Sequence, residues 1–403
     1  MKKDLASEVR IKKISGNTDI PNIDVSVITV VYNAIEGKRK DMLLQCLDSV
    51  QMQQGLSVEH LIIDGGSVDG TVDLIECYAN DSVPIRYLTM RDEGIYDAMN
   101  RGMFLAKGKY VTYLNSDDFY HKSDGLAISF KKLEDTKCDY SFAPVSTMGH
   151  SWLGNPQLHP WYYIENACFR SIFSHQTMLV NRTLMNEMNG FDLTYRSAAD
   201  YDFVLRLILS QKRGCFVDYC FVSYRMTGLS STNIEQSQKE TARAILCQYA
   251  SFLDVKLTEK EALRIHVSSK FPFRYLRFKK KVVQRVIKTI VGLPETPKIK
   301  QGFWLDVKYA ATCLVTGHWI ALRNFLWVNC GKHFSKKWYV IKYGEDLSEY
   351  KLPLAVHYIQ KGWHEGKDPA PCFSTELYLT DHLDARQKNI CPLIHRKLIK
   401  YHK

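Results

Sequence analysis

The sequence contains no C-x-x-C pair, although 11 cysteines are scattered over its 403 residues. Zinc sites and redox motifs built on cysteine pairs are therefore not indicated. An odd, unpatterned set of cysteines fits a reducing cytosol better than the disulfide framework of a secreted protein. Residues 1–23 are polar and lack the apolar core of a signal peptide. The most apolar stretch, residues 309–328, is interrupted by His318 and Arg323, so a membrane span is not expected.

Acidic residues are outnumbered by basic ones. The chain has 43 Asp and Glu against 54 Lys and Arg, which gives a formal net charge of +11. Such an excess points to an anionic partner, either nucleic acid or a membrane surface. Hydrophobic residues make up 45% of the chain, enough for two or three domains with cores of their own.

Two common phosphate-binding motifs, G-x-G-x-x-G and G-x-x-x-x-G-K-[ST], are missing, so neither a dinucleotide fingerprint nor a P-loop is present. What the chain has is an alternation of strand and helix patterns, which predicts parallel βαβ units. Buried-strand patterns cover residues 25–31, 58–63, 85–89 and 109–114, and helical patterns cover residues 41–50, 72–78 and 94–106. The loops that follow these strands should lie on one edge of one sheet, where open α/β sheets bind their ligands.

Two adjacent carboxylates, Asp117 and Asp118, follow the fourth predicted strand. At a sheet edge they would repel each other unless a cation neutralised them, and their hard oxygen atoms suit Mg²⁺ or Mn²⁺. Mg²⁺ commonly completes its shell with substrate phosphates, which predicts a metal–diphosphate site. From these residues alone a solvated turn is the favoured interpretation, since Asn, Ser and Asp favour turns.

Four segments occur in order along the chain: residues 25–33 (VSVITVVYN), 63–71 (IDGGSVDGT), 94–102 (GIYDAMNRG) and 114–118 (LNSDD). Together they resemble the motifs of family 2 glycosyltransferases of the GT-A fold, in particular those of the bacterial exopolysaccharide and lipopolysaccharide branch. The resemblance covers roughly residues 24–235. It implies an α/β fold with a mixed, mainly parallel sheet flanked by helices, and the chain continues into a helical C-terminal extension.

The resemblance also implies which residues bind a nucleotide-sugar donor. They are Val30, Tyr32, Asn33, Asp64, Asp92, Gly94, Asn100 and Arg225. The first four correspond to the nucleoside pocket, the next three lie beside the ribose and sugar, and Arg225 belongs to a loop over the diphosphate. The planar guanidinium of arginine suits phosphate recognition. For Asp64, a role within its own turn is the alternative.

The resemblance assigns the metal to Asp117, the likelier shared ligand in this motif, with Asp118 as a second candidate. Three positions depart from the pattern of many relatives. Gly65, Asn115 and Ala199 stand where those relatives carry acidic residues. Gly65 leaves the identity of the nucleotide base open, and Asn115 leaves fewer negative charges to bind the metal.

A carboxylate at the position of Asp200 is the general base in the family. Inverting transfer needs a group that removes the proton of the acceptor hydroxyl, and a carboxylate in hydrogen-bond reach contributes roughly 10²–10⁴-fold. Asp202, two residues later, matches a structural acid of the family. A cap at the helix N-terminus could explain one of these acids. His175 is expected to be a packed histidine, with contact to the metal or acceptor as the alternative.

We expect a catalytic domain over residues 24–255, a basic helical segment over 256–330 and a small aromatic-rich repeat module over 331–403. Residues 264–288 contain nine Lys or Arg and no acid, interleaved with apolar side chains. This pattern predicts binding to an anionic membrane surface. A charged helix packed on the catalytic domain is the alternative. Nucleic acid would meet the same charges, but no recognised motif accompanies them, so no nucleic-acid partner is expected.

The repeat module repeats at an offset of 39 residues, with Pro353-Leu354 recurring as Pro392-Leu393. Each copy is followed closely by a histidine, His357 or His395, and these are expected to pack because their spacing is not a ligand pattern. The role of the module is left open.

These observations predict an inverting, metal-assisted glycosyltransferase that moves a sugar from a nucleotide-diphosphate sugar to a glycan or lipid-linked acceptor. It would work in the cytoplasm, peripherally at the inner face of the plasma membrane. Two alternatives are a metal-dependent nucleotidyltransferase on a related sheet and a catalytically silent scaffold for membrane or partners. The segments at 94–102 and 199–207 favour the first of the three, and the three missing acids keep the scaffold open.

Overall fold

A computed structural model gives the structure of the chain in two compact units. One unit comprises Met1–Ser146 with Tyr163–Leu293, and the other comprises Thr147–Tyr162 with Pro294–Lys403. The boundary predicted at residue 330 falls inside the second unit. The structure describes residues 10–11, 22–78, 85–148, 157–158, 174–225, 234–253, 256–268, 284, 288–292, 303–330, 334–344, 347, 352–370 and 373–401.

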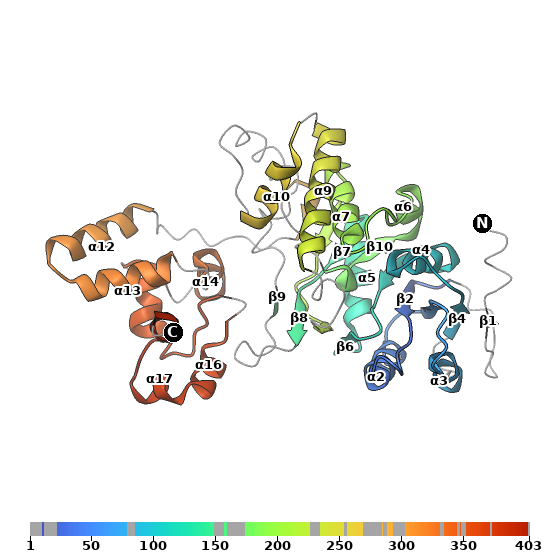
Figure 1. The fold of residues 1–403 in the computed structure, drawn as a ribbon, viewed down its shortest axis with the longest axis horizontal. Coiled ribbons are helices and arrows are strands. Elements are labelled where there is room, and N and C mark those ends of the chain that lie inside the picture. The colour runs from blue at the N-terminus through green and yellow to red at the C-terminus, as the bar shows by residue number, and fades with distance from the viewer. Residues whose placement is uncertain are drawn as a thin grey trace. The chain divides into compact units, whose positions relative to one another are not determined.

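The first unit is built on a nine-stranded sheet in the order β1-β4-β3-β2-β5-β10-β7-β11-β13 (Figure 1). The strands are β1 Arg10–Ile11, β2 Val25–Val31, β3 Val58–Asp64, β4 Ile85–Thr89, β5 Tyr110–Tyr113, β7 Tyr140–Phe142, β10 Leu179–Asn181, β11 Gly214–Phe216 and β13 Ile290–Val291. β4, β3, β2 and β5 run parallel. β10 is antiparallel to both of its neighbours, β5 and β7. The sheet is therefore mixed and mainly parallel, as predicted.

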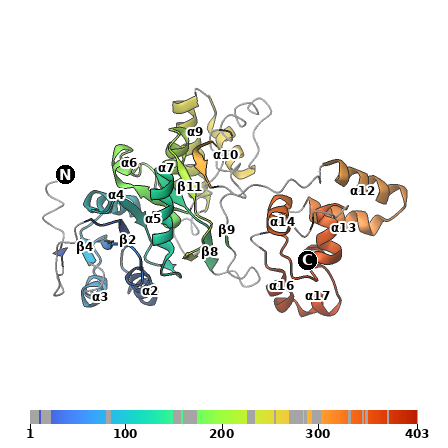
Figure 2. The same ribbon diagram turned by 180° about the vertical axis from the view of Figure 1, so that it is seen from behind.

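Helices cover both faces of the parallel part of the sheet (Figures 1 and 2). The helices of this unit are α2 Lys40–Gln51, α3 Thr71–Tyr78, α4 Ile95–Leu105, α5 Gly125–Thr136, α6 Arg182–Glu187, α7 Ala199–Leu209, α9 Ile234–Leu253 and α10 Glu259–Ser268. Side chains of α2 and α3 share a buried cluster with Val31 and Ile62. On the other face a Cβ added at Gly102 of α4 would lie 2.5 Å from Ile28. Because strand side chains alternate, β2 is buried from both sides, which explains why five of its seven residues are Val or Ile.

The four parallel strands end where the sequence predicts. β2 has the predicted bounds, and β3, β4 and β5 agree with prediction to within one residue at each end. Their carboxyl ends lead into the loops that carry Asn33, Asp64, Asp92 and Asp117. Across this edge β6 (Phe119–Tyr120) pairs antiparallel with β12 (Val222–Arg225). This pairing brings Arg225 next to the two carboxylates that follow β5.

The second unit is helical in its described residues. Its helices are α12 Phe303–Val315, α13 Trp319–Asn329, α14 Lys336–Tyr343, α15 Leu354–His357, α16 Thr375–Asp381, α17 Leu383–Gln387 and α18 Pro392–Tyr401, with a π-helical turn at Tyr358–Gly362. α13 packs against α15 and α18. The short strands β8 Val145–Met148 and β9 Gln157–Leu158 complete the described elements.

None of the described helices combines the length and the hydropathy that a membrane crossing requires. Of the basic segment 264–288, positions 269–283 and 285–287 lie outside the described residues. The neighbouring β13 adds a strand to the sheet of the first unit by pairing with β11. The predicted segment 256–330 therefore supplies a strand as well as helices.

Candidate active site

The loop after β3 is held together by Asp64. Its carboxylate accepts hydrogen bonds from the backbone N–H groups of Gly66 and Ser67 at 3.0 and 2.9 Å and from the hydroxyls of Ser67 and Thr89 at 2.5 Å. The side chain is almost fully buried. Asp64 therefore fixes the turn beside the predicted nucleoside pocket, which matches the alternative given by the sequence. Contact between Asp64 and a nucleotide stays a prediction.

Tyr32 and Asp92 flank Gly65 at the same edge. A Cβ added at Gly65 would lie 2.7 Å from Oδ2 of Asp92 and 3.3 Å from the ring of Tyr32. Asp92 thus fills the space beside the position where many relatives carry an acid. Burial raises the pKa of Asp92, and the charges of Asp97 and Asp64 act in the same direction. The ring of Tyr32 is 56% exposed and offers an aromatic face beside this carboxylate.

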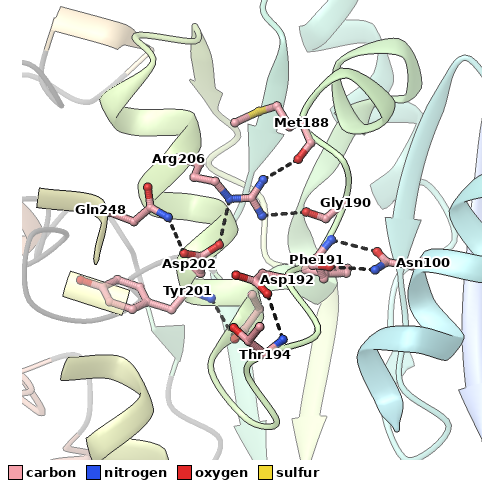
Figure 3. Close-up of polar contacts among 11 residues, drawn as sticks. Asn100, Met188, Gly190, Phe191, Asp192, Thr194, Tyr201, Asp202, Arg206 and Gln248 are labelled. Carbon is pink, nitrogen blue, oxygen red and sulfur yellow. Dashed lines mark hydrogen bonds and ion pairs between the residues drawn. The ribbon is translucent and has the colours of Figure 1, made fainter. Parts of the chain in front are cut away.

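The remaining donor-side residues have mainly backbone partners. Val30 is buried in β2. The side chain of Asn33 accepts a hydrogen bond from Val68 N–H at 3.2 Å. Gly94 precedes α4 and donates its N–H to Oδ1 of Asp92 at 3.0 Å. Asn100 is turned toward Phe191, to which its amide both donates and accepts hydrogen bonds of 2.8 Å (Figure 3). Asn100 thus positions the chain before α7.

The two carboxylates after β5 have different environments. Asp118 is fully buried and accepts hydrogen bonds from Arg225 N–H at 2.8 Å and from Nε2 of Gln176 at 2.9 Å. Burial, followed by the charge of Asp117, raises the pKa of Asp118 to about 7. Asp117 is half-buried. Asp117 is therefore the better placed of the two for an incoming cation, and Asp118 is held by its protein partners.

The donor set fits a hard divalent cation. Asp117 and Asp118 are adjacent carboxylates, and after burial the charge of Asp117 is the main cause of the raised pKa of Asp118. A cation between these carboxylates and the solvent would offset their repulsion. Oδ1 of Asn115, which precedes them, is buried without a hydrogen-bond partner in the described residues. Asp117 and Asp118 are too few to fill a six-coordinate shell, so the diphosphate and water would supply the other ligands.

Arg225 closes this side of the site. Its guanidinium donates to the backbone carbonyl of Asp117 and to the side chain of Gln45, and it lies 4.9 Å from the centre of the Phe119 ring. The predicted phosphate-binding arginine is therefore placed directly beside the predicted metal ligands.

Asp200 lies in the first turn of α7 with its side chain 26% exposed. Its carboxylate accepts hydrogen bonds from the hydroxyl of Tyr96 at 3.1 Å, from Tyr201 N–H at 2.9 Å and from Nδ1 of His175 at 3.3 Å. Burial acts to raise the pKa of Asp200, but the hydrogen bond and charge of His175, with the other two donors, outweigh it and lower the pKa. The carboxylate is therefore ionised at neutral pH.

A single 3-10 turn, His175–Thr177, connects Asp200 to Asp118. His175 contacts Asp200, and the next residue, Gln176, contacts Asp118. Nε2 of His175 is buried without a hydrogen-bond partner in the part of the chain that the structure describes. The ring of His175 therefore has a polar contact with Asp200, and its contact with a metal or acceptor stays a prediction. The role of Gln176 was missed, and its only signal in the sequence was its position directly after His175.

Asp202 faces away from this cluster. It is almost fully buried and pairs with Nε of Arg206 at 2.8 Å and with Nε2 of Gln248 at 2.6 Å. Arg206 also donates to the carbonyls of Met188 and Gly190, both at 2.6 Å. Figure 3 shows this network between α7 and the loop that leads to it. The geometry supports the choice of Asp200 over Asp202 as the exposed acid.

Taken together, the mixed sheet, the two carboxylates after β5 and the separate acid on α7 belong to one α/β domain. Residues 26–191 match the family model described as Glycosyl transferase family 2. This part of the chain is a family 2 glycosyltransferase domain.

Relatives with assigned names agree with this family. A PGL/p-HBAD biosynthesis glycosyltransferase of Mycobacterium bovis (strain BCG / Pasteur 1173P2) is 32% identical over 170 residues, which cover 41% of this chain and 64% of that protein. A glycosyltransferase of Rickettsia felis described as uncharacterized is 31% identical over 180 residues, which cover 44% of this chain and 29% of that protein. The match thus spans less than two thirds of the length of either relative.

Solved structures show similarity at lower identity. Staphylococcus aureus TarS 1-349 in complex with UDP-GlcNAc has a TM-score of 0.47 and 16% identity, over 68% of this chain and 82% of TarS 1-349. The mannosyltransferase PcManGT from Pyrobaculum calidifontis, in complex with GDP-Man and Mn²⁺, has a TM-score of 0.45 and 16% identity, over 80% of this chain and 86% of PcManGT.

Proposed function

We propose that the protein is an inverting glycosyltransferase that moves a sugar from a nucleotide-diphosphate sugar to a hydroxyl of a glycan or lipid-linked acceptor. The family 2 domain supports sugar transfer. The observation that carries the mechanism is the ionised, partly exposed carboxylate of Asp200, which is connected to Asp118 through His175 and Gln176. An ionised acid in this position can accept a proton, whereas the buried Asp118 cannot reach an acceptor.

In the proposed reaction, Asp200 takes the proton of the acceptor hydroxyl as its oxygen attacks the anomeric carbon. The bond to the nucleotide diphosphate breaks on the opposite face of the sugar, which inverts the configuration. The hydrogen bonds from Tyr96 and His175 hold the carboxylate in place and keep it ionised. Such positioned general bases contribute roughly 10²–10⁴-fold to the rate.

The cofactor in this proposal is Mg²⁺ or Mn²⁺, held by Asp117 with Asp118 beside it. When bound, such a cation acts as a Lewis acid that neutralises the charge of the leaving diphosphate. Arg225 adds a fixed positive charge at the same place, since its guanidinium lies against the backbone of Asp117. Tyr32 and Asp92, on either side of Gly65, would contact the nucleoside.

The proposal places the enzyme in the cytoplasm, peripherally at the inner face of the plasma membrane. Its support is the net charge of +11 and the nine basic residues of segment 264–288. Deletion of this segment should abolish flotation with vesicles that contain anionic lipid. Unchanged flotation of the deletion variant would rule out the membrane proposal without affecting the proposed reaction.

The function is tested by a thermal-shift screen of nucleotide sugars with and without Mn²⁺, followed by product analysis with the donor that stabilises the protein. Ligands stabilise by mass action, so one donor should stand out. We expect release of a nucleoside diphosphate and a glycoside of inverted configuration. Release of a sugar 1-phosphate, left when the nucleotidyl group is transferred in place of the sugar, would identify a nucleotidyltransferase. A protein that binds no donor would be a scaffold.

A further inference from the structure

The C-terminal repeat places one tyrosine–histidine pair in each copy. In the first copy the hydroxyl of Tyr339 lies 2.9 Å from Nδ1 of His357, and in the second copy the hydroxyl of Tyr378 lies 3.2 Å from Nδ1 of His395. Both histidines are buried. Because the pair occurs twice, it is part of the packing of the repeat. The contact with the tyrosine hydroxyl occupies Nδ1 of each imidazole ring, so that Nε2 is the nitrogen left to bind a ligand.

The second copy adds two side chains to this pair. Nε2 of His395 lies 2.8 Å from Oδ2 of Asp384, and the ring of His382 lies 5.6 Å from the ring of His395, centre to centre. One potential ligand atom from each of His382, Asp384 and His395 lies within 4.8 Å of the other two. In the described part of the chain this is the one such group of three His, Cys, Asp or Glu side chains.

The first copy serves as an internal comparison. Thirty-nine residues before His382 the chain has Tyr343, whose hydroxyl accepts a hydrogen bond from Asp368 N–H at 2.9 Å. Tyr343 packs against Tyr339, as His382 packs against Tyr378. An aromatic ring at this position therefore satisfies the packing of the repeat. A histidine at position 382 is therefore not needed for packing alone.

We propose that His382, Asp384 and His395 form a binding site for a divalent transition metal such as Zn²⁺. Imidazole and carboxylate are ligands that Zn²⁺ accepts, and three protein ligands with one open position make a common zinc site. With metal–ligand bonds of about 2.0–2.1 Å, tetrahedral ligands stand about 3.3 Å apart, so a pair of ligand atoms 4.8 Å apart has to approach by about 1.5 Å. The side chain of Asp384 is 54% exposed, which leaves room for water in the fourth position.

The surroundings of His395 suit a metal ligand. Ligating histidines usually hold their second nitrogen in a hydrogen bond, which fixes the ring and its tautomer. Tyr378 provides this contact at Nδ1 and directs Nε2 toward Asp384. His382 stands between α16 and α17, whereas His395 belongs to α18. The metal would therefore join the corner between α16 and α17 to α18 and stabilise the second copy of the repeat.

This site differs in chemistry from the proposed cation site at Asp117. The latter offers carboxylate oxygens, which suit Mg²⁺ or Mn²⁺, whereas two imidazoles select later transition metals. The two proposals are therefore independent, and either can fail alone. A test of the site at His382, Asp384 and His395 has to exclude metal binding at Asp117. The substitution Asp117→Asn in a buffer with excess Mg²⁺ achieves this.

The experiment is a calorimetric titration of the full-length Asp117→Asn protein with Zn²⁺ after treatment with EDTA. We expect one tight equivalent that disappears in His382→Ala and falls at least tenfold in affinity in Asp384→Asn. The matched control is His364→Ala, which removes an exposed histidine of the same unit outside the cluster and should leave the titration unchanged. The proposal is overturned if the cluster variants bind Zn²⁺ with the stoichiometry and affinity of the parent.

Thermal unfolding provides a second measurement. Zn²⁺ should raise the unfolding temperature of the Asp117→Asn protein and of its His364→Ala variant, and it should raise that of its Asp384→Asn variant clearly less. Asp384 is largely exposed, so its substitution should leave the unfolding temperature without metal near that of the parent. An equal rise in the parent and in Asp384→Asn would contradict the proposal even if His382→Ala failed to fold.

Discussion

The contact between His175 and Asp200 leads to a quantitative prediction about the pH dependence of the reaction. Burial alone would raise the pKa of Asp200, and His175 is the main group that lowers it. Both side chains are less than one third exposed, at 19% and 26%. A hydrogen bond to a charged group is worth about 1.5–3 kcal/mol, and one pKa unit corresponds to about 1.4 kcal/mol. Loss of the imidazole should therefore raise the pKa of Asp200 by about one to two units.

The substitution is His175→Leu, which removes the donor and keeps a similar volume. A general base works only when it is deprotonated, so the acidic limb of the kcat/KM profile should move to higher pH by the same one to two units. His175→Asn is the matched variant, because its amide keeps a neutral donor near the position of Nδ1. It should show a smaller shift than His175→Leu.

The assay is steady-state transfer with the donor found in the screen, measured between about pH 3 and pH 9 so that it reaches the acidic limb of the parent, which lies below the ordinary aspartate pKa of about 3.9. The reasoning is refuted if His175→Leu loses activity by the same factor at every pH, with the acidic limb unmoved. In that case His175 would act through the fold or the substrate and not through the protonation of Asp200. Circular dichroism at each pH shows that the variants are folded.

Three further substitutions test the rest of the structure. Arg206→Met leaves Asp202 buried without its cation and should lower the free energy of unfolding in urea by about 3–5 kcal/mol; a loss below 1 kcal/mol would contradict the network of Figure 3. Gly65→Ala should displace the carboxylate of Asp92, since the new Cβ would lie 2.7 Å from it, and weaken donor binding about tenfold in calorimetry with the unfolding midpoint unchanged. Tyr32→Ala should weaken binding of the nucleoside diphosphate, whereas equal affinity would exclude Tyr32 from the pocket.

The parallel core of the fold could be predicted from the sequence. β2 and β3 are buried from both faces, and the Val, Ile and Leu residues of their sequences, VSVITVV and VEHLIID, mark them as buried strands. β10 and β13 could not be predicted, because they have only three and two residues. Such short strands form because neighbouring strands offer backbone hydrogen bonds to them. Their own sequences have too few residues to show a strand pattern that differs from that of a loop.

The residues of the site could be predicted better than their contacts. The carboxylates of Asp117 and Asp200 follow strand and helix signals that a single sequence shows. The contact between Gln176 and Asp118 joins residues that are 58 positions apart, and such a pairing has no local pattern. The resemblance assigns Asp64 and Asn100 to the donor. In the structure Asp64 accepts hydrogen bonds from backbone N–H groups and hydroxyls, and Asn100 donates to the backbone of Phe191. These contacts also have no local pattern in the sequence.

The central claim is that Asp200 is the base of an inverting sugar transfer. The most direct measurement compares the transfer rate of Asp200→Asn with that of the parent at saturating donor and acceptor, together with the anomeric configuration of the product by NMR. We predict a product of inverted configuration and a rate that falls by about 10²–10⁴-fold, with donor affinity unchanged. Transfer by Asp200→Asn at the parent rate, or a product of retained configuration, would contradict the account.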